Sequence, residues 1–349
     1  MKANKLPSGS WNVQVFVGMD QNGKKIRKSF TAPTKKEAEY LAASFKAHHQ
    51  EVTRDSTAMT LSEAIDKYID FKGGTLSPST IRGYRYIQKK AFPSIMNLKI
   101  SKLTLNNVQR AINAEIGIKK PKTLNNEIGL VRSVVKLYAP SIDLSALSLP
   151  QAKKYNSQEL TLDQVESLLV EITKDELAIP LLIAICLGLR ISEISALKWR
   201  DYNREEKLMN IDKALVRDID NNMIQKGTKT EESKRTITVP DFLCRLLDEE
   251  QHDPETHILT MSQSAVREHL KKICKRLDIP LVRVHDLRHI NASVMLFLNI
   301  PARYAMERGG WSDIKTMDKI YQFTFKDKKR VVDERINNFF TQILEADSI

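Results

Sequence analysis

The chain has 349 residues, with 55 Lys or Arg against 43 Asp or Glu, which gives a formal net charge of +12. This length predicts two or three domains with enough buried surface to fold without disulfides or structural metals. No apolar run approaches the length of a membrane span, and the N-terminal MKANKLPSGSW lacks the apolar centre of a signal peptide. The cysteines are far apart and show no metal-binding spacing, which predicts reduced thiols in a cytoplasmic protein.

The positive charge is concentrated in the first 150 residues. Residues 1–56 hold ten Lys or Arg against five Asp or Glu, and residues 57–150 hold fourteen against six. The rest of the chain holds 31 against 32 and is nearly neutral. A basic half joined to a neutral half predicts a polyanion-binding region beside a module with another task. On charge alone, the alternative is a basic surface that only aids solubility.

Residues 1–56 predict a small sheet braced by one helix. SWNVQVFVG alternates in strand fashion, Asn22-Gly23 favours a tight hairpin turn, and KKIRKSF returns as a second strand. KKEAEYLAASFKAHH then changes to a helical period. The predicted buried stripe of this helix consists of Ala38, Leu41, Ala42 and Phe45. The basic residues of this sheet and its turn, which are candidates for the polyanion contact, are Lys24, Lys25, Arg27 and Lys28.

Residues 57–150 predict a domain of four short helices. A capping box, Thr60 to Glu63, starts the first, and Ser77 before Pro78 starts the second. The third starts at residues 101–104, and the fourth follows Thr123. The basic residues expected on the outside are Arg82, Arg85, Lys89, Lys90, Lys119, Lys120 and Lys122. A plain helical domain with solvated basic residues is the alternative.

A polar linker at residues 148–161 leads to the third domain, where Thr161 and Gln164 form another capping box. Helices are predicted at 162–172 and 177–198. Three strand-like runs follow, KLMNIDKALV, NMIQKG and RTITVP, and we expect them to form one three-stranded antiparallel sheet. Thr228-Lys229-Thr230 lies at the turn before the last run.

Two charged motifs interrupt the apolar pattern of this domain. GLRISEISALKW places Arg190 and Glu193 three apart beside an apolar stripe, where a charge requires a partner. VHDLRHINAS places His285 and Arg288 three apart on one helix face. A Gly-Gly turn, Trp311 and Tyr321 follow. Each residue alone would be an ordinary surface or half-buried side chain, but the joint pattern is unusual.

Together these motifs resemble the tyrosine recombinase, or phage integrase, family. The resemblance spans about the whole chain and is most specific over residues 157–325. It implies a mainly α multidomain fold with small β-sheets. The implied domains are a three-stranded sheet plus helix that binds arm-type DNA in the major groove (1–56), a helical, SAM-like core-binding domain (57–150) and a mixed α/β catalytic domain with a C-terminal tail helix (157–349).

The resemblance also implies the site. The matching catalytic positions are Arg190, Lys229, His285, Arg288, Trp311 and Tyr321, the nucleophile. Glu193 and His289 match supporting positions, while Lys226 and Lys234 are rivals of Lys229, and Tyr304 is the first rival of Tyr321. The family often has His where this chain has Trp311; an indole N–H can donate a hydrogen bond but cannot accept a proton.

These residue types suit phosphodiester cleavage without a metal. Two permanently charged arginines can each fork onto the non-bridging oxygens of a pentavalent transition state. The unperturbed pKa of a tyrosine phenol is about 10, so Tyr321 needs cations or a base such as His285 to attack readily. Lys229 is then the expected acid for the leaving 5′ oxygen.

The resemblance implies an integrase that inserts and excises a prophage or a conjugative transposon through a 3′-phosphotyrosyl intermediate and a Holliday junction, with no cofactor. The implied partners are double-stranded DNA at core and arm sites, three further copies in a homotetramer, and an excisionase or host DNA-bending protein, with no membrane. The tail at 331–346 carries an apolar stripe that docks either on its own domain or on a neighbouring protomer. The alternatives are a chromosome-dimer resolvase, an architectural DNA-binding protein and a metal-dependent nuclease.

Overall fold

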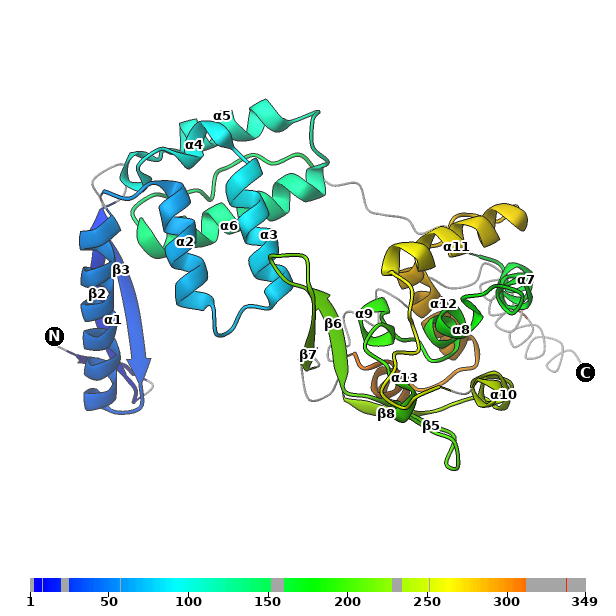
Figure 1. Ribbon diagram of the computed structural model, residues 1–349. Helices are drawn as coiled ribbons and strands as arrows, with labels where there is room; N and C mark the ends of the chain where they lie inside the picture. Colours follow the sequence, from blue (N-terminus) through cyan, green and yellow to red (C-terminus); the bar gives the residue numbers. More distant parts are fainter. Residues whose placement is uncertain are drawn as a thin grey trace, which may run out of the picture. The chain divides into compact units, whose positions relative to one another are not determined.

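The computed structural model describes residues 3–7, 9–19, 25–56, 58–151, 160–227, 234–250, 252–311 and 337 (Figure 1). Apart from residues 217–222, the chain divides at residues 154–155 into two compact units. Within the described ranges, no helix combines the length and the apolar character that crossing a bilayer requires.

The N-terminal part of the first unit is an antiparallel sheet in the order β1 (Asn4–Lys5), β2 (Trp11–Met19) and β3 (Lys25–Ala32), followed by α1 (Lys35–Ser56). The predicted sheet plus helix is therefore confirmed. Its core joins Val13 and Val15 of β2 to Ala38 and Ala42 of α1. Leu41 was predicted to be buried but is 41% exposed, because α1 meets the sheet through a narrow stripe of small residues.

The rest of this unit is helical. Its elements are α2 (Leu61–Lys72), α3 (Pro78–Lys90), α4 (Pro93–Met96), the 3₁₀ turn η1 (Ile100–Lys102), α5 (Leu105–Glu115) and α6 (Pro121–Tyr138). The predicted starts are confirmed at three of these helices, where Thr60, Ser77 and Thr104 accept hydrogen bonds from the third residue of each helix. The short helix α4 was not predicted, although it begins with a proline.

A buried polar cluster holds the start of α4. Phe92 has a φ of +46°, which is rare outside glycine, and its N–H donates to Glu115 Oε1 at 2.7 Å. The ammonium of Lys119 lies 2.5 Å from Glu115 Oε2 and 2.9 Å from Glu127 Oε2. Lys119 also lies over the ring of Phe92, with 5.7 Å between the ammonium and the ring centre. Two buried carboxylates thus share one lysine as their cation.

The second unit is a mixed α/β domain. Its helices are α7 (Leu162–Ile172), α8 (Ala178–Cys186), α9 (Ile191–Ile194), α10 (Asp241–Glu249), α11 (Gln263–Arg276), α12 (Val284–Phe297) and α13 (Ala302–Gly309), with the 3₁₀ turn η2 (Trp199–Asp201). Residues 181–185 of α8 are all buried, and this helix packs against α7, α10, α11 and α12. It is the centre of the domain core (Figure 1).

Two predictions for this domain are wrong. A single helix over 177–198 was expected, but Gly188 adopts a φ of +68° and separates α8 from α9. A single three-stranded sheet was also expected from the three strand-like runs. Instead, Asp212 splits the first run into β5 (Leu208–Ile211) and β6 (Lys213–Arg217). In the described part, β5 pairs with β4 (Tyr202–Asn203) and β8 (Arg235–Thr238), while β6 pairs with β7 (Met223–Gly227) in a separate hairpin.

The polar cluster at α4 generates a prediction about stability. We expect Lys119→Met to lower the free energy of unfolding of the helical domain by about 2 kcal/mol, because it leaves two buried carboxylates without their cation. Chemical denaturation followed by circular dichroism measures this effect. Lys120→Met, at the exposed neighbouring lysine, is the matched control and should change stability by less than about 0.5 kcal/mol. If the two substitutions changed the free energy of unfolding equally, the cluster around Lys119 would make no specific contribution to stability.

Candidate active site

Arg190 is held in place directly before α9. Its backbone N–H donates to Glu193 Oε2 at 2.9 Å, and its Nη1 donates to Glu193 Oε1 at 2.6 Å. Its Nη2 donates to the carbonyl oxygen of Gly310 at 3.2 Å, across 120 positions of sequence. The side chain nevertheless remains 36% exposed. Arg190 is therefore fixed in orientation while part of its guanidinium stays open to a ligand.

Glu193 is the carboxylate that organises this side of the site. It is 3% exposed, and besides Arg190 it accepts a hydrogen bond at 3.0 Å from Nη2 of Arg235 in β8. Burial alone would raise the pKa of Glu193, but Arg235 and then Arg190 outweigh burial and hold the pKa below its ordinary value. The carboxylate is therefore ionised at neutral pH, and it anchors two arginines at once.

Arg288, in the first turns of α12, is almost completely buried at 1% exposure. Its Nη1 donates to the carbonyl oxygen of Gly188 at 2.6 Å. Its Nη2 is buried and has no hydrogen-bond partner among the residues that the structure describes. Burial, and then the charge of Arg190, lower the pKa of Arg288 to about 9, so the group stays protonated at neutral pH. An unpaired donor on a buried cation is costly unless an anion meets it.

The Gly309–Gly310 turn places Trp311 over Arg288. The centre of the guanidinium lies 4.1 Å from the centre of the indole ring, and Trp311 is 7% exposed. Gly310 has a φ of +65°, and a Cβ there would also meet Arg235 Nη1 at 2.9 Å. A Cβ at Gly309 would collide with the six-membered ring of Trp311. Both glycines are therefore needed for the indole to cover the arginine.

His285 and His289 form an edge-to-face pair one helical turn apart, with ring centres 4.6 Å apart. His285 stands at the exposed rim of the site. Partial burial of its ring, and then the nearby Arg288, lower the pKa of His285. Burial, and then His285, lower the pKa of His289 to about 4. Both rings are therefore neutral at neutral pH, which leaves His285 able to accept a proton.

The structure thus brings together six of the eight residues predicted for the site. These are Arg190, Glu193, His285, Arg288, His289 and Trp311. The other two, Lys229 and Tyr321, lie outside the described residues. So do Lys24 and, apart from Asn337, the tail at 331–346. Of the rivals, Lys226 is half-buried at the end of β7, Lys234 is exposed, and Tyr304 is 64% exposed on α13.

The basic residues predicted to contact DNA fall into different environments. On the N-terminal sheet, Arg27 lies opposite the exposed Phe16 on the face away from α1. Lys28 lies opposite the buried Val15, and its ammonium is 4.5 Å from the ring centre of Phe45 on α1. The ammonium of Lys28 therefore already makes a cation–π contact within its own domain.

In the helical domain, Arg85 forms an ion pair with Asp66, and Lys119 is clamped between two carboxylates. We therefore remove Lys119 from the proposed DNA-contacting set, because its charge is already neutralised inside the domain. The remaining members are exposed, and they are Arg82, Lys89, Lys90, Lys120 and Lys122.

Sequence reasoning missed two residues that hold the site together. Arg235 is 4% exposed in its side chain, and its Nε donates to the carbonyl oxygen of Arg308 at 3.0 Å. Asn291 donates to the carbonyl oxygen of Cys186 at 2.9 Å and lies against Gly188. A signal for Arg235 existed, since it shares a strand face with the buried Ile237. Nothing local distinguishes Asn291 from other polar helix residues.

Comparison with known proteins identifies this arrangement. Residues 158–328 match the phage integrase family, and residues 42–116 match the N-terminal SAM-like domain of phage integrases. The chain belongs to the phage integrase family. Its C-terminal half is the catalytic domain of a tyrosine-type site-specific recombinase.

Two full-length relatives illustrate the family. The ICEBs1 integrase of Bacillus subtilis (strain 168) is 23% identical over 371 residues, covering 97% of this chain and 100% of that protein. A XerC-like tyrosine recombinase of Caldanaerobacter subterraneus subsp. tengcongensis is 25% identical over 391 residues, covering 97% of this chain and 99% of the relative.

Solved structures share the fold. The Tn1549 transposon integrase in complex with transposon right end DNA has a TM-score of 0.63 at 17% identity, covering 80% of this chain and 100% of that chain. A lambda integrase dimer bound to a COC′ core site has a TM-score of 0.55 at 13% identity, covering 91% of this chain and 93% of that chain.

The position of Arg235 generates a prediction about this integrase. We expect Arg235→Gln to slow DNA strand cleavage roughly 10- to 100-fold with little change in DNA affinity, because Glu193 and the turn before Trp311 lose their common anchor. Single-turnover cleavage and equilibrium binding measure the two effects separately. Arg276→Gln removes an exposed arginine that also pairs with a glutamate, and it should cleave like the wild type. A parallel loss of binding and cleavage would contradict the positioning role.

The lowered pKa of His289 predicts a pH dependence of stability. Its ordinary pKa is 6.5, and the folded value is about 4. Between these pH values the unfolded chain binds a proton that the folded chain does not, so stability is complete above this window and falls as pH drops through it. His289→Gln removes this titration. Relative to the difference between variant and wild type at neutral pH, we expect the variant to gain roughly 1–2 kcal/mol in free energy of unfolding near pH 4.5, and partial exposure of the ring limits the gain. Urea denaturation at several pH values measures this, and a pH-independent difference would count against it.

Proposed function

We propose that this integrase inserts and excises a mobile element, a prophage or a conjugative transposon, by metal-independent cleavage and rejoining of DNA. Each strand would pass through a 3′-phosphotyrosyl intermediate, and two duplexes would exchange strands through a Holliday junction. The observation that carries the proposal is the pair of guanidinium groups of Arg190 and Arg288. The guanidinium of Arg190 is partly exposed. That of Arg288 is buried, and its Nη2 has no hydrogen-bond partner among the described residues.

The two arginines match the charge of the reaction. The phosphate carries a single charge in the duplex, and attack by the tyrosine places more negative charge on its non-bridging oxygens. Arg190 and Arg288 are both held by carbonyl groups, so they need little rearrangement when this charge develops. Their fork-shaped donors suit two phosphate oxygens better than a lysine would.

Proton transfers complete the proposed reaction. Tyr321 would attack the phosphorus while its phenolic proton passes to His285, whose lowered pKa keeps it neutral and able to accept. Lys229 would donate a proton to the 5′ oxygen as the P–O bond breaks. The 5′-hydroxyl of another strand could then attack the phosphotyrosine and reverse these steps, so no external energy source is required.

Trp311 would shield the guanidinium of Arg288 and would take no part in proton transfer. The indole covers the guanidinium and keeps it away from water, which strengthens its attraction for a phosphate. Because an indole N–H can only donate, no base role falls on this position. The base role therefore rests with His285.

The basic N-terminal half supports double-stranded DNA as the substrate. We propose that residues 1–56 bind arm-type sites, that residues 57–150 grip the core site mainly through phosphates, and that residues 157–349 perform the chemistry. The Tn1549 integrase and the lambda integrase, which share this fold, were both solved with DNA bound. From membership of the family we further propose a homotetramer on DNA, an excisionase or host DNA-bending protein as partner, and the bacterial cytoplasm as location.

Covalent trapping tests the proposed chemistry. The probe is a nicked duplex that spans the joined ends of the element encoding the chain, incubated in EDTA with wild type, Tyr321→Phe or Tyr304→Phe. We expect the wild type and Tyr304→Phe to form a protein–DNA adduct that survives denaturant, and Tyr321→Phe to form none, because its ring lacks the attacking oxygen.

The other outcomes are distinct. An adduct that persists in Tyr321→Phe and disappears in Tyr304→Phe would move the nucleophile to Tyr304. Cleavage that requires a divalent metal and leaves no adduct would identify a nuclease. Tight binding without any adduct or cleavage would favour an architectural protein.

A further inference from the structure

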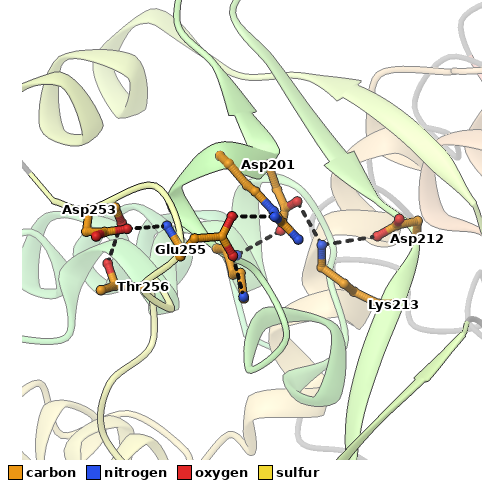
Figure 2. Close-up of polar contacts among 8 residues, drawn as sticks. Asp201, Asp212, Lys213, Asp253, Glu255 and Thr256 are labelled. Carbon is orange, nitrogen blue, oxygen red and sulfur yellow. Dashed lines mark hydrogen bonds and ion pairs between the residues drawn. The ribbon is translucent and has the colours of Figure 1, made fainter.

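A buried ion pair lies at the base of the β6–β7 hairpin (Figure 2). Lys213, the first residue of β6, donates to Asp201 Oδ1 at 2.8 Å, and both side chains are only 10% exposed. The second oxygen of Asp201 accepts the backbone N–H of Lys198 at 2.8 Å. Asp212 lies 3.6 Å from the same ammonium but is 60% exposed. Asp201 is therefore the main anion that holds this buried cation.

Asp201 is itself rigidly placed by the segment on which it lies. The backbone of η2 is tied to the loop at 253–256, where Trp199 donates to the carbonyl oxygen of Thr256 at 3.1 Å and Arg200 to that of Pro254 at 3.0 Å. The carboxylate of Glu255 pairs with both Lys198 and Arg200 (Figure 2). Asp201 thus offers Lys213 an acceptor in a fixed position.

The ion pair joins two parts of the catalytic domain that matter for chemistry. On one side, η2 follows α9, which begins directly after Arg190 and contains Glu193. On the other side, β6 pairs with β7, and among the described strands this hairpin shares no ladder with the β4-β5-β8 sheet. The hairpin therefore lacks the strand hydrogen bonds that would fix it to the rest of the domain, and Lys213 supplies a directional contact at its base.

The end of β7 leads to the proposed general acid. β7 ends at Gly227, two residues before Lys229 in the sequence. The position of the hairpin thus sets the point from which the chain continues to Lys229. We propose that Lys213 and Asp201 are positioning residues that aim the β6–β7 hairpin so that Lys229 protonates the leaving 5′ oxygen. This inference rests on the proposed function, in which Lys229 is the acid.

An ion pair suits this task better than an apolar contact. Apolar packing is non-directional, whereas a buried lysine with one fixed carboxylate has a single favourable geometry. Removing the lysine leaves Asp201 buried with only a backbone donor, so the base of the hairpin must shift or admit water. A shift of about 1 Å in a catalytic group can cost about 100-fold in rate.

The leaving group provides a readout that separates positioning from folding. In the normal step the Tyr321 oxygen bonds to phosphorus, the P–O5′ bond breaks, and a proton moves from Lys229 to the 5′ oxygen. When sulfur replaces that oxygen, the P–S bond breaks and the strand leaves as a thiolate. Because a thiol has a pKa of about 8.5, this leaving group needs no proton. A defect in the acid should therefore disappear with the sulfur substrate, whereas a defect in Arg190, Arg288 or the fold should remain.

The experiment measures single-turnover cleavage of two duplexes that span the joined element ends, one with a normal 5′ oxygen and one with a 5′-bridging sulfur. The variants are Lys213→Met, Lys213→Arg and the double variant Asp201→Asn with Lys213→Gln. Lys229→Ala is the reference for loss of the acid. Lys207→Met is the matched control, because Lys207 forms an exposed ion pair with Asp241 in the same domain. Thermal unfolding and DNA affinity are measured for every variant.

We expect Lys213→Met to cleave the oxygen substrate about 10- to 100-fold more slowly than wild type, and the sulfur substrate within about 3-fold. Lys229→Ala should show the same pattern with a larger defect, Lys213→Arg should recover part of the rate, and Lys207→Met should match wild type. The double variant removes the buried charge from both partners, so it should remain folded and show the same selective loss.

Four results would overturn the inference. Normal cleavage of the oxygen substrate by both Lys213→Met and the double variant would remove any positioning role. Equal loss on both substrates would make the ion pair a support for the fold alone. If Lys229→Ala is rescued by sulfur but Lys213→Met is not, only the inference fails. If Lys229→Ala is not rescued, the assignment of the acid fails and the inference fails with it.

Discussion

The structure of the catalytic domain depends on one buried carboxylate that must serve several cations. Glu193 binds Arg190 and Arg235 directly, and burial, together with the nearby charges of these two arginines, lowers the pKa of Arg288. Three guanidinium groups thus share one nearby acid, and the site has a surplus of positive charge in a poorly hydrated place. Such a surplus is unfavourable in the free protein. In the proposed reaction it would become favourable when a phosphate binds, so that the repulsion among the cations would assist binding of the charged transition state.

Two glycines with left-handed backbone make this arrangement possible. Gly188 and Gly310 have φ angles of +68° and +65°, and each turns a carbonyl oxygen toward an arginine. Gly188 accepts from Arg288, and Gly310 accepts from Arg190. The carbonyls orient the cations but leave their charge in place, whereas a second carboxylate would neutralise it. The backbone therefore contributes geometry while the net charge needed for the chemistry is kept.

Local signals predicted much of the fold, while long-range contacts decided the rest. The helix starts at Thr60, Ser77 and Thr104 follow from capping chemistry within four residues, and all were predicted. The break at Gly188 was missed because Asn291, which packs against it, is about a hundred residues away. Arg235 was missed because its partners are Glu193 and the carbonyl of Arg308. Lys119 was assigned to the surface because nothing in the sequence shows that Glu115 and Glu127 are both buried beside the exposed turn that joins α5 to α6.

The packing of Trp311 also couples the residue types that positions 309 and 311 can hold. No side chain larger than hydrogen fits at Gly309 while the indole covers Arg288, because the Cβ would occupy the space of the six-membered ring. An imidazole at position 311 has no such ring, so a chain with His there could accept alanine at 309. Alanine at 309 and tryptophan at 311 together would make the Cβ collide with the indole ring. The residue allowed at position 309 thus depends on the residue at position 311, and the tryptophan of this chain requires the glycine two positions before it.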